Sequence, residues 1–197
     1  MRDEQLCLVW CNDAYVRLSD RPESELLGTR MGRYIPKAAA AEREAVLTRV
    51  LGSGVAESFF QFGADKRLLC HVIPCDPESF GHTGVLVLLQ EAPLGTALAD
   101  EVRLPVLSTP CLDRLGLLSP SELRALYHLS LGRSTADIAE VLCRATKTVE
   151  KHIESVHRKL GTSSRAEIVR LASERGLQSF SADEWESIIH GAKVARR

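Results

Sequence analysis

One stretch of the sequence, from Thr146 to Leu160, carries side chains that could bind a polyanion. Its apolar residues recur with the spacing of a single helical stripe: Val149, Ile153, Val156 and Leu160. The other side of the same helix is charged and polar: Lys147, Lys151, Glu154 and Arg158, flanked by Glu150, His152 and Lys159. Ammonium and guanidinium groups bind phosphate or guanine, and a carboxylate accepts a hydrogen bond from cytosine N4. We therefore treat this face as a candidate nucleic-acid surface. The alternative is an ordinary solvated helix face.

The residues upstream predict how that helix is positioned. Residues 134–142 form a short amphipathic pattern with Ile138, Ala139 and Leu142 on one side. Only residues 143–145 separate this pattern from the charged helix. Two short helices joined by so tight a turn are typical of a helix-turn-helix, whose second helix enters the DNA major groove.

Two further helices complete the predicted unit. Residues 119–122, Ser-Pro-Ser-Glu, are a capping box with proline at the first helical position, and Gly132 is placed to end that helix. Another helix is predicted from Ser163 to Arg175, with Gly176 as its stop. The expected result is a compact four-helix domain.

This spacing resembles the C-terminal DNA-binding domain of LuxR-type (FixJ/NarL-type) bacterial transcription regulators. The matching residues are Leu118, Ser119, Pro120, Ser121, Glu122, Gly132, Ile138, Ala139, Leu142, Thr148, Val149, Glu150, His152, Lys159, Leu160, Gly161, Ser164, Arg165, Ala166 and Glu167. The family usually has serine where Ala145 stands, at the cap of the recognition helix. Losing such a cap costs about 1 kcal/mol unless Thr146 replaces it.

The resemblance implies double-stranded DNA as the partner, a homodimer as the assembly, and RNA polymerase as a further partner. We expect phosphate contacts from four residues: Lys147, Lys159, Thr135 and His152. We expect base contacts from four others: Glu150, Lys151, Glu154 and Arg158. Thr148 completes the predicted DNA-contacting set. The family commonly pairs through its fourth helix, where Val169 and Ala172 lie one turn apart.

Length and charge agree with a two-part chain. The 197 residues carry a net charge of −1, but residues 119–175 hold 10 Lys and Arg against 7 Asp and Glu. A basic segment joined to an acidic one fits a domain that faces phosphates, attached to a second domain that does not bind DNA. No apolar run is long enough to span a membrane and the first residues lack a signal-peptide layout, so we expect no membrane association and a cytoplasmic location.

The six cysteines are Cys7, Cys11, Cys70, Cys75, Cys111 and Cys143. They form no Cys-x-x-Cys pair and no Cys/His ladder with zinc spacing, so we predict no metal site. Cys70 and His71 could be imagined as a thiol switch or an enzyme's nucleophile and base. No orienting acid or oxyanion motif accompanies them, and buried thiols commonly fill strands. We therefore predict that the chain is not an enzyme.

The first half of the chain has the element order of an α+β domain. Residues 6–11 have the composition of a buried strand, residues 13–28 are helical in parts, and Ala38–Leu51 is a helix ended by Gly52-Ser53-Gly54. Three strands are then expected, at Glu57–Phe62, Arg67–Ile73 and Val85–Gln90.

This order resembles a PAS domain, a sensor module of bacterial signalling proteins. The residues that carry the resemblance are Asn12, Asp13, Ala14, Tyr15, Glu25, Leu26, Leu27, Gly28, Pro36, Val50, Leu51, Gly52, Gly54, Gly84, Val85 and Leu86. A PAS sheet normally has one more strand before the Asn12 position, and this chain begins too late to supply it. Three explanations stay open: the true start lies further upstream, another subunit fills the gap, or the domain is a reduced form. An absent strand would leave a sheet edge open to a partner subunit.

No cofactor is expected in this domain, and a small-molecule ligand stays unidentified. Flavin-binding PAS domains need a cysteine near residues 29–34, and haem-binding ones need a histidine on the long helix, here residues 37–51; neither is present. Gly52-Ser53-Gly54 lacks the lysine of a phosphate loop. A phosphoryl-receiver domain also fits poorly, because no aspartate ends an apolar strand.

The complete prediction is an α+β chain: an N-terminal PAS-like antiparallel sheet with helices, followed by an all-α four-helix helix-turn-helix domain. The boundaries are residues 1–91 for sensing or dimerisation, 92–117 for a linker with a helical turn or two around Ala97–Leu104, and 118–197 for DNA binding. The tail includes an extra helix, Asp183 to about Lys193, with Ser181 and Glu184 as a capping box. The alternative is a signalling protein whose helical domain contacts protein rather than DNA.

Overall fold

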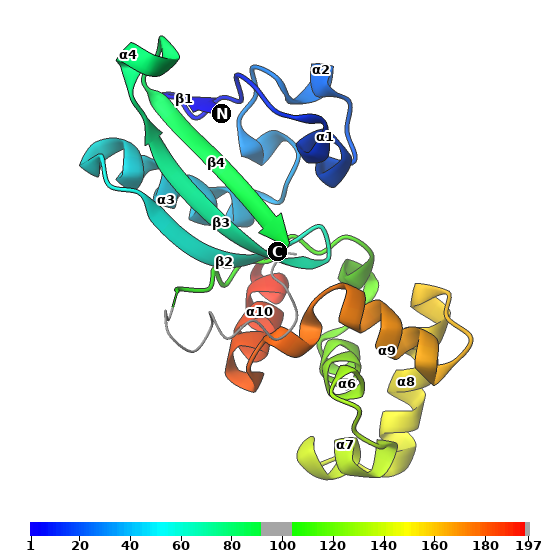
Figure 1. Ribbon diagram of the computed structural model, residues 1–197. Helices are drawn as coiled ribbons and strands as arrows, with labels where there is room; N and C mark the ends of the chain where they lie inside the picture. The colour runs from blue at the N-terminus through cyan, green and yellow to red at the C-terminus, as the bar shows by residue number, and fades with distance from the viewer. Residues whose placement is uncertain (92–103, 196–197) are drawn as a thin grey trace.

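The computed structural model describes residues 1–91 and 104–195. The chain folds into a sheet domain followed by a helical domain, with the last helix lying between them (Figure 1). The predicted α+β order is therefore confirmed.

The sheet is antiparallel and four-stranded, in the order β1-β4-β3-β2. Its strands are β1 (Arg2–Asp3), β2 (Glu57–Gly63), β3 (Lys66–Cys75) and β4 (Gly84–Glu91). The three long strands confirm the three predicted ones to within two residues. Ala64 and Asp65 join β2 to β3 with φ values of 51° and 56°, the left-handed conformation that a two-residue hairpin turn requires.

Helix α3 (Lys37–Ser53) covers one face of the sheet, as Figure 1 shows. Val46, Leu47 and Val50 on α3 pack with Phe59 and Val72 of the sheet, and all five are nearly inaccessible to water. The other short elements are α1 (Asp13–Ser19), α2 (Glu23–Leu26), a 3-10 turn (Met31–Arg33) and α4 (Pro77–Phe80).

The strand predicted at residues 6–11 is wrong. Leu6 has φ 65°, and the segment makes only an isolated bridge, between Leu8 and Arg2. Its backbone instead bonds across to the loop after α2: Leu8 N–H donates to Thr29 C=O at 3.0 Å, and Gly28 N–H donates to Leu8 C=O at 2.8 Å. The prediction that the chain begins too late to supply a strand before this segment is also wrong. Arg2–Asp3 forms a short strand beside β4, pairing Arg2 with Val85 and Asp3 with Gly84.

The helical domain contains the four predicted helices and the predicted tail helix. Their bounds are α6 (Pro120–Ser130), α7 (Thr135–Val141), α8 (Thr146–Leu160), α9 (Arg165–Glu174) and α10 (Ala182–Ala195), with 3-10 turns at Arg114–Leu117 and Leu177–Ser179. The capping box of Ser119 and Glu122 is present as predicted. So is the box of Ser181 and Glu184, through two N–H···O bonds of 2.7 and 3.2 Å.

One core holds these helices together. Leu126, Ile138, Val149, Val156 and Ile168 are all fully buried in it. Ala172 is buried there as well, at 0% exposure. The prediction that Ala172 offers a pairing surface on the fourth helix is therefore wrong, because its methyl group already packs inside the domain.

The turn between β2 and β3 attaches the sheet to the helical domain. Phe62 at the end of β2 is completely buried against Phe180 and Trp185, at ring distances of 5.8 and 5.7 Å. The Asp65 carboxylate accepts hydrogen bonds from the N–H groups of Asp113, Arg114 and Leu115, at 2.9 to 3.3 Å. Asp65 therefore acts as the cap of a helical turn that belongs to the other domain.

The chain that enters the helical domain is fixed from both sides. On one side, Glu42 of α3 accepts hydrogen bonds from the N–H groups of Ser108 and Thr109, both at 2.8 Å. On the other, Gly191 of α10 lies so close to the Ser108 carbonyl that a Cβ would stand 1.9 Å from its oxygen. Any side chain at 191 would displace this segment. The helical turn predicted around Ala97–Leu104 falls almost entirely outside the described residues.

Candidate nucleic-acid interface

Helices α7 and α8 form a tight pair at the end of the helical domain away from the sheet (Figure 1). Ser134 caps α7 through a reciprocal box with Asp137, whose carboxylate accepts from Ser134 N–H at 2.9 Å. The turn between the helices includes Cys143 at φ 50°. Arg144 N–H closes this turn by donating to Ala139 C=O at 2.9 Å.

The apolar stripe of α8 anchors it, and the charged side faces water. Val149, Val156 and Leu160 are buried, and Ile153 is half-buried against the same core. The exposed residues of the predicted set are Lys147, Glu150, Lys151, Glu154 and Arg158. Thr135, Thr148, His152 and Lys159 are half-buried. Packing therefore leaves the charged face of α8 open.

Intrahelical contacts on this face are weak. Lys147 Nζ lies 3.4 Å from Glu150, but the two side chains are 80% and 46% exposed. Arg158 donates to Ser155 Oγ at 3.1 Å. An exposed ion pair contributes about 0–1 kcal/mol and a typical hydrogen bond about 0.5–1.5 kcal/mol, so neither cation is held firmly by its neighbour.

Lys159 makes a contact within the domain that the sequence did not predict. Its ammonium group lies 2.7 Å from a carboxylate oxygen of Glu122, a side chain only 8% exposed at the start of α6. Burial alone would raise the pKa of Glu122. The hydrogen bonds from Lys159 and from Ser119 N–H outweigh this effect and hold the pKa at about 2. Lys159 therefore joins α8 to α6.

The start of α8 differs from the starts of its neighbours. Serines cap α6, α7 and α9: Ser119, Ser134 and Ser164. At α8 the cap is Ala145, which has no side-chain acceptor, and Thr146 is already the first helical residue. Thr146 therefore does not replace the missing cap. The first amides of a helix carry positive partial charge and bind anions readily.

Arg144 was missing from the predicted set. It is exposed in the turn directly before α8, beside the uncapped helix start. A basic residue in the turn of a helix-turn-helix was visible in the sequence, but no periodic pattern marked its orientation. We add it to the candidate phosphate contacts.

The cysteines do not assemble a reactive site. Neighbouring residues of a strand point to opposite faces: Cys70 is buried in the core, where burial raises the pKa of its thiol to about 12, and His71 bonds Ser58 Oγ at 2.8 Å. The two side chains therefore cannot act as a nucleophile and base pair. Within residues 1–91 and 104–195, no three His, Cys, Asp or Glu residues are placed to hold a metal ion.

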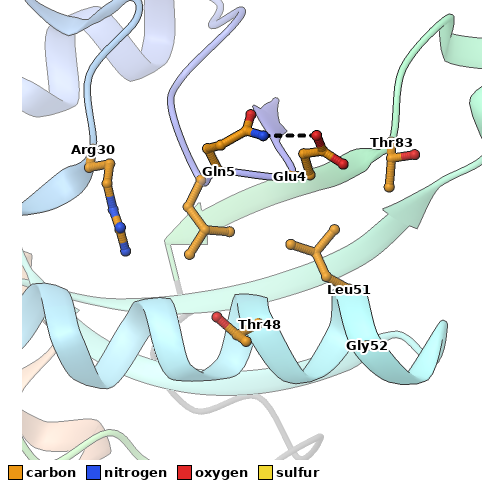
Figure 2. Close-up of a pocket in the computed structure, with 8 residues that line it drawn as sticks. Glu4, Gln5, Arg30, Thr48, Leu51, Gly52 and Thr83 are labelled. Carbon is orange, nitrogen blue, oxygen red and sulfur yellow. Dashed lines mark hydrogen bonds between the residues drawn. The ribbon is translucent and has the colours of Figure 1, made fainter.

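Two pockets open on the described surface of the sheet domain bear on a possible ligand. The first, about 520 Å³, lies between the N-terminal loop and the end of α3. Figure 2 shows Glu4 and Gln5 on one side of it and Thr48 and Leu51 on the other. The second, about 550 Å³, is lined by polar residues that include Arg33 and Tyr34.

Behind the second pocket lies a buried arginine. Arg2 is only 3% exposed, and its guanidinium donates to Leu6 C=O at 2.9 Å and to the hydroxyl of Tyr34. Tyr34 in turn shares a hydrogen bond of 2.9 Å with Tyr15. Burial is the main cause that raises the pKa of Tyr34. These groups satisfy one another and hold the N-terminal segment in place.

Comparison with known proteins identifies the class of the helical domain. Residues 116–172 match the model of the luxR family of bacterial regulatory proteins. These residues contain α6, α7, α8 and most of α9, and they form a LuxR-type helix-turn-helix domain. No helix in the described part of the chain is long and apolar enough to cross a membrane.

Individual relatives match the same part of the chain. The transcriptional activator protein ExaE of Pseudomonas putida is 39% identical over 69 residues, which are 35% of this chain and 32% of that protein. A protein of Mycobacterium bovis named as an HTH-type transcriptional regulator is 39% identical over 64 residues, 32% of this chain and 7% of its own length. The chain thus spans a third or less of these relatives.

Solved structures of VqmA are similar along most of the chain. The Vibrio cholerae VqmA dimer without target DNA is 22% identical, with a TM-score of 0.46, covering 94% of this chain and 85% of that one. The VqmA–ligand–DNA complex is 21% identical, with a TM-score of 0.47, covering 100% and 86%.

Proposed function

We propose that this chain is a sequence-specific DNA-binding transcription regulator. The observation that carries the proposal is the LuxR-type helix-turn-helix, whose recognition helix leaves its charged face and uncapped start open to solvent. Lys147, Arg144 and the first amides of α8 suit phosphate contacts, with Thr135 and His152 beside them. Base contacts would come from the middle of the face: Glu150, Lys151, Glu154 and Arg158.

Lys159 enters this mechanism as a positioning residue. Its ion pair with Glu122 fixes the angle between α8 and α6, which sets how α8 is presented to the groove. Removing it would change affinity through the orientation and stability of the domain rather than through a lost phosphate contact.

We further infer that the sheet domain is PAS-like and works as a sensing or dimerising module. The order β1-β4-β3-β2 and the covering helix α3 support this assignment, with Leu8 bridged to Arg2 as the remnant of a further strand. Two copies of the chain would then bind DNA, with RNA polymerase as a further partner. We keep the prediction that the domain holds neither flavin nor haem, which the absorbance spectrum of the purified protein checks.

The test of base reading is selection of genomic DNA fragments by the purified chain, followed by affinity measurements on the selected sequence. Lys151→Ala should weaken binding to that sequence by about 1–3 kcal/mol and relax the preference at one base pair. Lys37→Ala is the matched control, because Lys37 is exposed at the start of α3, outside the helical domain. If Lys151→Ala and Lys37→Ala bind alike, Lys151 does not contact a base.

A second candidate function has one observation in its favour. Glu150 and Glu154 place two carboxylates on the recognition face, where they repel phosphates. A helical domain that contacts protein instead would enrich no sequence in the selection, and its weak binding to DNA would not depend on which fragment is offered.

A further inference from the structure

The sheet's two edges differ in how much of each the chain itself covers. On the β2 side, Phe60 N–H donates to Pro105 C=O and Leu107 N–H donates to Phe60 C=O, both at 2.8 Å. On the β4 side, β1 pairs only with Gly84 and Val85. Beyond Val85, no described residue pairs with the outer edge of β4. Among residues 1–91 and 104–195, therefore, nothing pairs with the outer edge of residues 86–91, which we call the open edge.

Exposure changes where β1 ends. Gly84 and Val85 are buried, and Val85 has 0% exposure. Every following residue of β4 is half-buried or exposed, and Leu88 reaches 47%. Val87 and Leu89 face α3 but are only partly covered. The strand therefore loses its cover as soon as its neighbour stops.

The open edge has none of the residue types that usually prevent strand pairing. Residues 85–90, Val-Leu-Val-Leu-Leu-Gln, contain no charge and no proline, whereas exposed edges are normally protected by lysine, proline or a bulge. The nearest charge, Glu91, is paired with Lys66. Alternate residues of the strand present N–H and C=O groups outward.

We propose that residues 86–91 of β4 pair antiparallel with the same strand of a second copy of this chain, joining two sheets across a two-fold axis. Residues 86–90 carry no charge with which to select a different partner, and Glu91 is already paired with Lys66. An antiparallel strand is complementary to its own copy about such an axis. The inference rests on the proposed function, because that function requires two copies: one helix-turn-helix reads only a few base pairs.

Backbone pairing of six residues covers less than the roughly 800 Å² per partner of a standard interface. The outer face of the sheet supplies the remainder. Leu86 and Leu88 lie on it, and Ile73, paired in register with Leu86, is 38% exposed. These side chains are continuous with the open edge, so one surface offers both hydrogen bonds and apolar area.

Charge substitutions at Leu88 test the pairing. Leu88→Lys and Leu88→Asp each place like charges near the two-fold axis, and each should weaken dimerisation of the full chain by roughly a hundredfold. An equimolar mixture of the two variants should restore dimers that contain one copy of each. Val55→Lys is the matched control, since Val55 is 64% exposed and outside β4; it should dimerise as the unchanged chain does.

Sedimentation equilibrium measures the association state of the unchanged chain, the two Leu88 variants, their mixture and the Val55→Lys control. Thermal unfolding checks that each protein is folded. A dimeric unchanged chain, two monomeric variants and a dimeric mixture support the proposal. An unchanged chain that is monomeric at about 100 µM, a concentration at which specific interfaces form, would overturn it. So would variants that dimerise normally, or a mixture that stays monomeric.

The same proteins separate this proposal from the proposed function. Monomeric Leu88 variants should still bind random-sequence DNA in low salt, because that binding depends on the helical domain alone. Dimers that bind no DNA would refute the proposed function and leave the strand pairing intact.

Discussion

The backbone of the two domains is held by partners at different separations in the sequence. In the helical domain, the starts of α6, α7 and α9 are held by serines next to the helices they cap. In the sheet domain, the first residues are held by distant partners, such as Thr29 for Leu8 and Tyr34 for Arg2. Local caps can be read from a sequence, whereas distant partners cannot.

Residues of both domains pack together at the junction between them. Removing a side chain from this junction should have the largest effect on stability. Phe62→Ala removes a fully buried ring from between Phe180 and Trp185, which should lower the free energy of unfolding by about 3–5 kcal/mol. Because Phe62 belongs to the sheet and its partners to the helical domain, we also expect one unfolding transition to split into two. Calorimetry measures both effects.

Phe80→Ala is the matched control, since Phe80 is 44% exposed on α4. It should change stability by less than about 1 kcal/mol. Equal losses of unfolding free energy in the two variants would mean that the contacts of Phe62 with Phe180 and Trp185 do not couple the domains.

The ion pair between Lys159 and Glu122 should dominate the acid limb of stability. The folded pKa of Glu122, about 2, lies below the ordinary 4.5. Its contribution is therefore fully present above pH 4.5 and lost as the pH falls toward 2. Glu122→Gln should cost about 2–3 kcal/mol at pH 7, because it leaves Lys159 without its partner, and should flatten stability between pH 4.5 and 2.

Urea unfolding at a series of pH values measures this dependence. Glu174→Gln is a suitable control, because Glu174 pairs with Arg170 at the surface and is 54% exposed. Parallel pH profiles for the two variants would show that the Glu122–Lys159 pair contributes no more to the acid dependence of stability than the surface pair does.

These contacts show how much the sequence could predict. The capping boxes at Ser119 and Ser181, the glycine stops and the apolar stripe of α8 are local, and each was predicted at its observed place. The three long strands were also predicted, because their residue types and turns are local signals. Residues 6–11 were misassigned because their bonds go to Met1, Gly28 and Thr29, and apolar composition alone does not reveal such partners.

The predicted site shows the same limit. Lys147, Lys151 and Arg158 lie exposed on the face that helical spacing gave them. The contact between Lys159 and Glu122 was not predicted, because Glu122 is 37 residues earlier and already belonged to a capping box. A helical wheel shows which side of a helix a residue occupies, but not what lies opposite it.

The smallest expected change concerns the uncapped start of α8. Ala145→Ser should provide the acceptor that the other helices have and raise the free energy of unfolding by about 1 kcal/mol. Ala136→Ser places the same change inside the first turn of α7, already capped by Ser134, and should give no gain. Chemical unfolding at pH 7 compares the two variants. No gain in unfolding free energy for Ala145→Ser would mean that packing, and not the missing cap, limits the stability of α8.

The most direct measurement is the affinity of the purified chain for its selected DNA as a function of salt concentration. Each phosphate contact contributes about −0.9 to the slope of log K against log salt. Lys147→Ala should flatten that slope by about one unit, because Lys147 is 80% exposed and its ion pair with Glu150 is weak. Lys159→Ala should leave the slope unchanged while lowering stability, because its charge is held by Glu122. A flattened slope for Lys159→Ala with none for Lys147→Ala, or no salt dependence at all, would contradict this assignment of the interface.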